Sequence, residues 1–145
     1  MRASIWLRAL AGLLVLFTLG HTKGVLASAP QGGRQAAIVG AMQGARFPIM
    51  GFLRSYWDFY HGFGLVISLL LAALAVLAWQ LAGLSRQAPR AALPLTATLM
   101  LALGGLAVLS WQYFFWGPIV MSVAGFLLAG IALLLLGREA GAAGV

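Results

Sequence analysis

The composition of this 145-residue chain excludes a water-soluble globular fold. Hydrophobic residues make up 63% of it and charged residues 8%, and the formal net charge is +7. A domain of this size has too little interior to bury so much apolar surface, so the chain needs lipid around it. The basic residues are scattered between apolar segments, which argues against nucleic acid as a partner and favours a role in membrane topology. The absence of cysteine excludes disulfides, thiolate chemistry and iron–sulfur clusters.

The first apolar segment, residues 9–26, is long enough for a transmembrane helix, with Arg8 before it and Lys23 near its end. The same stretch also fits a secretory signal peptide, because Ala27-Ser28-Ala29 is a small-x-small cleavage pattern. We favour the transmembrane interpretation, since Pro30 directly after this pattern hinders cleavage there. Cleavage of residues 1–27 is the alternative, and it would leave three spans.

Residues 30–60 form the one sizeable segment that we expect outside the bilayer. Polar residues recur at helical spacing in its middle, at Gln35, Gln43 and Arg46. Apolar residues lie between them, at Ile38, Val39, Met42 and Ala45. This pattern predicts an amphipathic helix that lies in the membrane interface or caps the bundle. A partly ordered linker is the alternative.

Three further spans are predicted, at residues 62–84, 93–115 and 119–136. The stretch between Arg90 and Arg138 carries no charge and is too long for one crossing, which takes about 20 residues. Trp116-Gly117-Pro118 marks the turn between its two halves. Because hydrocarbon offers no partner for a free amide, each span must be helical. The sequence therefore predicts an all-α, four-helix transmembrane bundle, a single membrane domain over residues 1–145, with an additional interfacial helix in the first loop.

The basic residues also predict an orientation. One group lies before the first span, between the second and third spans, and after the fourth, at Arg2, Arg8, Arg86, Arg90 and Arg138. The other group lies near or within the first loop, at Lys23, Arg34, Arg46 and Arg54. Placing the short loop 86–90 in the cytoplasm puts both termini there and the first loop outside.

Polar and aromatic residues are densest at residues 52–64, where the first loop enters the second span. In a continuous helix Arg54, Asp58 and His61 would lie on one face, and Asp58 could accept hydrogen bonds from both neighbours. Ionisable groups in lipid are usually paired or functional. The candidate ligand-binding cluster at the outer mouth of the bundle is His21, Arg54, Tyr56, Asp58, Tyr60 and His61. The alternatives are a structural salt bridge and an aromatic belt at the membrane interface.

The sequence lacks the residues that several kinds of catalysis require. Asp58 and Glu139 are the only acids, which leaves no material for a paired-carboxylate mechanism. Two histidines and one nearby aspartate follow no recognised ligand spacing, so we expect no metal and no cofactor. Nucleotide-binding and acyl-transfer motifs are also missing.

Three stretches carry a resemblance: Gly20-His21-Thr22, residues 54–64 and Tyr113-Phe114-Phe115. There the chain resembles an uncharacterised family of small bacterial four-helix integral membrane proteins, loosely DoxX-like in architecture. The resemblance covers nearly the whole length. It implies the four-helix fold and a bacterial inner-membrane location, and it brings no known activity.

Our leading functional hypothesis is a non-enzymatic membrane protein that binds a lipid or another apolar small molecule at the outer polar cluster. The second is an accessory or assembly subunit whose small-residue faces contact a membrane partner or a second copy. The third is an enzyme that uses His61 and Asp58 as a proton-transfer pair.

Overall fold

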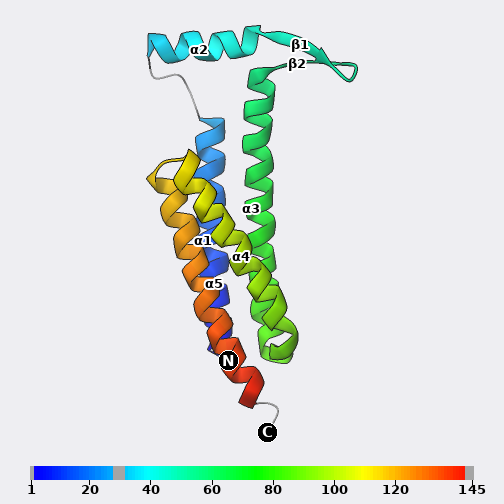
Figure 1. The fold of residues 1–145 in the computed structure, drawn as a ribbon, viewed down its shortest axis with the longest axis vertical. Coiled ribbons are helices and arrows are strands. Elements are labelled where there is room, and N and C mark those ends of the chain that lie inside the picture. The colour runs from blue at the N-terminus through cyan, green and yellow to red at the C-terminus, as the bar shows by residue number, and fades with distance from the viewer. Residues whose placement is uncertain (1, 28–31, 143–145) are drawn as a thin grey trace. The chain divides into compact units, whose positions relative to one another are not determined.

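The computed structural model describes residues 2–27 and 32–142, and most of the predicted cleavage pattern at residues 27–29 lies outside them. In the described ranges, five helices and one β-hairpin follow each other (Figure 1). They are α1 (Ala3–Leu26), α2 (Gly33–Gly44), β1 (Arg46–Ile49), β2 (Phe52–Ser55), α3 (Tyr56–Gln87), α4 (Pro89–Tyr113) and α5 (Trp116–Ala142). The predicted all-α class is confirmed, and the additional helix of the first loop is α2.

Four of the described helices, α1, α3, α4 and α5, are long and apolar enough to cross a membrane. In each of them the backbone groups pair within the helix, as hydrocarbon requires. The longest, α3, has 32 residues. Its length is therefore about 48 Å against about 30 Å of hydrocarbon, so at least one end of α3 reaches beyond the apolar layer. The chain is built as a multi-pass integral membrane protein.

The connections between the long helices are shorter than the sequence suggests. Phe114 and Phe115 alone separate α4 from α5, whereas the turn was expected at residues 116–118. Pro118 instead lies in the first turn of α5, where its missing N–H leaves no helical hydrogen bond unmade. Ala88 alone separates α3 from α4.

Packing divides the chain into two compact units. The first, which we call the core unit, comprises Met1–Phe17 and Leu71–Val145. The second, which we call the hairpin unit, is Thr18–Leu70. Helices α1 and α3 contribute to both, and each unit is described by itself.

The core unit is held together by close contacts between helices at small residues. A Cβ at Gly125 of α5 would lie 3.5 Å from Leu103 of α4 and 3.6 Å from Leu10 of α1. A Cβ at Gly104 would lie 3.2 Å from the ring of Phe126. Lipid is as apolar as leucine, so helices in a membrane associate mainly through such packing. The leucines behind these contacts are fully buried, at Leu7, Leu10, Leu14, Leu81, Leu99, Leu103 and Leu136.

Polar contacts join the helix ends in the core unit. The Glu139 carboxylate near the end of α5 accepts hydrogen bonds from the backbone N–H groups of Arg2 at 2.6 Å and Ala3 at 3.3 Å. These donors belong to the start of α1, where N–H groups have no partner within the helix. The guanidinium of Arg8 lies 5.6 Å from the ring centre of Trp79 in α3.

In the hairpin unit, the last turns of α1 run beside the first turns of α3. A Cβ at Gly64 would lie 2.8 Å from Cγ2 of Val25, so only glycine allows the two helices to approach this closely. Helix α2 and the hairpin precede α3 along the chain, and α2 has no buried residue. Val39 and Met42 are the half-buried residues of α2, in agreement with their place on the predicted apolar surface.

Candidate functional site

The β-hairpin decides which side chains of the first loop come together. Its register pairs Phe47 with Arg54 and Ile49 with Phe52, so these four side chains lie on one face of the two strands. The loop between the strands has two residues, Met50 and Gly51, with φ of 47° and 85°. Positive φ at both central positions is what a type I′ hairpin turn requires. We call this strand–turn–strand segment, Arg46–Ser55, the hairpin.

A reciprocal pair of hydrogen bonds starts α3 directly after the hairpin. The backbone N–H of Ser55 donates to Asp58 Oδ2 at 2.8 Å, and the backbone N–H of Asp58 donates to Ser55 Oγ at 3.2 Å. This is a capping box, which satisfies N–H groups that the helix leaves unpaired. It explains why α3 begins at Tyr56 rather than near residue 62. The Asp58 charge also lies at the positive end of the helix dipole.

Aromatic rings fasten the hairpin to the first turn of α3. The ring of Phe47 lies 5.0 Å from that of Tyr56 and 6.1 Å from that of Phe59, centre to centre. Distances in this range are typical of favourable ring contacts. One face of the hairpin is thus directed toward α3.

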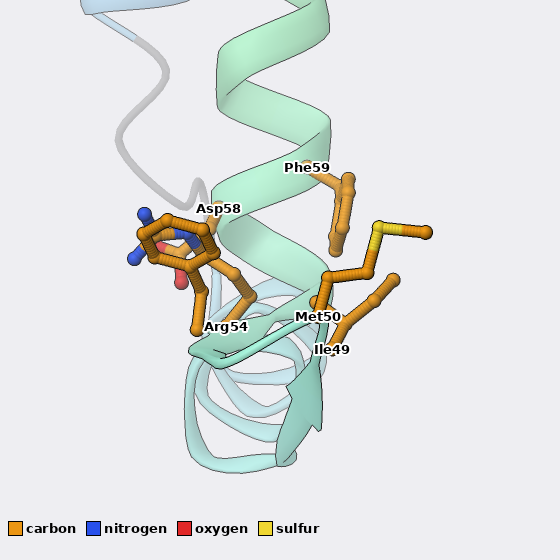
Figure 2. A pocket seen from close by; sticks show the side chains of 6 residues that line it. Ile49, Met50, Arg54, Asp58 and Phe59 are labelled. Atoms are coloured by element: carbon orange, nitrogen blue, oxygen red, sulfur yellow. The ribbon is translucent and has the colours of Figure 1, made fainter.

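A pocket of about 360 Å³ opens between this face and α3. Its lining residues are Ile49, Met50, Phe52, Arg54, Asp58 and Phe59. In Figure 2, Arg54 and Asp58 lie on one side of the pocket. Ile49, Met50 and Phe59 lie on the other side. The lining therefore has apolar side chains on one side and a cation and an anion on the other.

The two charged side chains of the pocket, Arg54 and Asp58, do not form a salt bridge with each other. The Arg54 guanidinium lies 5.2 Å from the ring centre of Phe52, and its Nη1 donates to the carbonyl of Leu53 at 3.4 Å. Asp58 bonds to Ser55, and within the described residues no salt bridge joins Asp58 to Arg54. Arg54 and Asp58 thus both line the pocket without forming an ion pair with each other.

His21 belongs to a separate polar contact in the hairpin unit, between α1 and α3. Its Nδ1 lies 3.0 Å from Ser68 Oγ, and Ser68 Oγ donates to the carbonyl of Gly64 at 3.2 Å. The imidazole of His21 and the hydroxyl of Ser68 are thus hydrogen-bond partners that join α1 to α3.

The structure brings part of the predicted cluster together. Arg54 and Asp58 share the pocket, although Arg54 lies in β2 and not on a helical face. Tyr56 packs against Phe47 beside the pocket. His61 stacks on Trp57 at 6.1 Å, and Tyr60 lies 5.6 Å from the same ring. No described residue other than Ser55 hydrogen-bonds to the Asp58 side chain, so Asp58 and His61 are not paired.

The residues that sequence reasoning missed are the apolar ones of the pocket: Ile49, Met50, Phe52 and Phe59. The one local indication was Gly51 between two short apolar runs, since a glycine at the second turn position is typical of type I′ hairpins.

No three of the His, Asp and Glu side chains in the described ranges lie close enough together to hold a metal ion. Comparison of the chain with protein-family models, curated proteins and solved structures finds no match. The interpretation of the pocket therefore depends on its own geometry.

Proposed function

We propose that this integral membrane protein binds an amphipathic lipid in the pocket between the hairpin and α3. The observation that carries the proposal is the division of the pocket into an apolar wall and a charged wall. Small-molecule sites are usually built in this way, from apolar lining with a few polar groups that orient the ligand. A volume of about 360 Å³ suits a headgroup and the first part of an acyl chain.

The chemistry of the charged wall favours a phosphate-containing headgroup. The guanidinium of Arg54 is a planar fork of donors, which matches phosphate oxygens. The carboxylate of Asp58 adds an acceptor for an ammonium or hydroxyl group of the same headgroup. Ile49, Met50 and Phe59 then contact the start of the acyl chain.

Native mass spectrometry of the detergent-solubilised protein tests this proposal with matched variants. Arg54→Gln removes the pocket cation, whereas Arg46→Gln removes a hairpin cation that does not line the pocket. We expect the first to lower lipid retention about tenfold, from a charge-assisted hydrogen bond of about 1.5 kcal/mol. The second should leave retention unchanged.

A second matched pair tests Phe52, the lining residue whose ring lies beside the Arg54 guanidinium. Phe52→Ala changes a lining residue and should lower retention, and Leu53→Ala changes the adjacent exposed residue on the other hairpin face and should not. A wild-type protein without bound lipid, or equal effects within both pairs, would contradict the proposal.

The proposal also assigns the protein to a membrane and predicts on which side its termini lie. In keeping with its resemblance to small bacterial four-helix proteins, we place the protein in a bacterial inner membrane. Four crossings bring both termini to one side, and the arginines flanking Ala88 favour the cytoplasm for that side. A reporter active only in the periplasm should be inactive when fused after residue 145, and activity there would reverse the orientation.

A further inference from the structure

We infer that the tip of the hairpin is a membrane-surface anchor that enters the headgroup layer of an anionic leaflet. The tip consists of Ile49, Met50, Gly51 and Phe52, together with Leu53. This inference concerns the bilayer surface and does not depend on a lipid held in the pocket.

The tip exposes large apolar side chains that are not buried within the protein. Met50 is 95% exposed, and Phe52 and Leu53 are 61% and 56% exposed. The first position of a type I′ turn normally holds Asn, Asp or Gly, because other residues are strained at positive φ. Met50 adopts φ 47° there and gains no buried contact in return. An apolar side chain in this position is explained by an apolar environment outside the chain.

Charge identifies that environment as an anionic lipid surface. Between residues 32 and 58 the chain carries three cations, Arg34, Arg46 and Arg54, and one acid, Asp58, which is hydrogen-bonded to Ser55. Arg46 and Arg54 lie toward the base of the hairpin, behind the apolar tip. An apolar edge backed by cations is the arrangement of segments that bind at the interface of anionic membranes.

The connection to α3 keeps the tip near the bilayer. β2 ends at Ser55 and α3 begins at Tyr56, so no linker intervenes. A four-residue strand extends about 13 Å, which is less than half the thickness of the hydrocarbon layer. Figure 1 shows the hairpin running across the axis of the first turns of α3 rather than along it. The tip thus stays at the level of the first turns of α3.

Site-specific fluorescence can test the anchor, because the chain has no cysteine of its own. Met50→Cys carries a polarity-sensitive fluorophore in the full-length protein, reconstituted as one copy per nanodisc. Leu53→Cys is a second labelling site, which does not line the pocket and has an ordinary strand conformation. Both probes should be quenched by nitroxide-labelled lipids and shielded from iodide in the water. The quenching should increase when phosphatidylglycerol is added to phosphatidylcholine.

Matched charge variants sharpen the test. Arg46→Gln should reduce the inserted fraction in anionic nanodiscs about fivefold, as expected for one cation near a charged surface. Arg90→Gln, the same change at the start of α4, should not. Iodide access to both probes in every lipid mixture would overturn the inference. Shielding that appears only with two copies per disc, or only in native membranes, would also overturn it, because a protein would then cover the tip.

Discussion

The core unit and the hairpin unit differ in what they bury. The core unit buries a stripe of leucines and small residues contributed by four helices. Among the described residues of the hairpin unit only Ser55 and Ser68 are buried, and both use their hydroxyls in local hydrogen bonds. The core unit therefore supplies its own interior, whereas the hairpin unit depends on hydrogen bonds, ring contacts and its surroundings. Binding sites are commonly found in such less self-sufficient regions.

The largest expected effect belongs to the interior of the core unit. Leu103→Ala removes a fully buried side chain that touches Gly125, and we expect a loss of about 2 kcal/mol of stability, the low end of the range for buried leucines. Leu101→Ala, two residues away and 69% exposed, should have little effect. Unfolding in mixed micelles with increasing SDS measures both. Equal losses would mean that the core unit is not packed as described.

The closest helix contact of the hairpin unit should be less costly to disturb. Gly64→Ala places a Cβ against Val25, and we expect a loss of about 1 kcal/mol after the gain in helix propensity. Gly62→Ala meets no atom within 4 Å and should be neutral or slightly stabilising. Crosslinking efficiency between cysteines at residues 21 and 68, whose side chains lie in contact, would report the change. If Gly62→Ala proved the more harmful of the two, the pairing of α1 with α3 would be wrong.

The capping box gives a smaller and more local effect. Ser55→Ala should destabilise the start of α3 by about 1 kcal/mol, because the backbone N–H of Asp58 loses its acceptor, Ser55 Oγ. Hydrogen exchange should accelerate at residues 55–59 and remain unchanged in α4 and α5. Ser55→Thr keeps the hydroxyl and should restore protection, a result that a bulk packing role for Ser55 would not produce.

The smallest effect is expected at the turn of the hairpin, with the opposite sign. Met50→Asn relieves a strained backbone position and should slow amide exchange in β1 and β2 by an amount that corresponds to about 0.5 kcal/mol. The same change should weaken insertion into anionic nanodiscs. A variant that gained stability without losing lipid contact would separate the turn geometry from the proposed anchor.

The four spans could be predicted because each is a long apolar stretch with at most one charged residue, which only a lipid-embedded helix satisfies. The start of α3 could not, because helical spacing alone placed Arg54 on the face of Asp58. The Asp58 carboxylate accepts a hydrogen bond from the backbone N–H of Ser55, which follows Arg54 in the sequence, and not from Arg54 itself. The hairpin was missed for a related reason: an apolar run around Met50 resembles the edge of a span, and methionine is unusual at positive φ.

Ser55 closes β2 and caps α3 with the same residue, so strand and helix meet without a flexible joint. The hairpin is consequently joined directly to the first turn of the helix. A force on the tip would therefore reach the first turn of α3 without a loop in between.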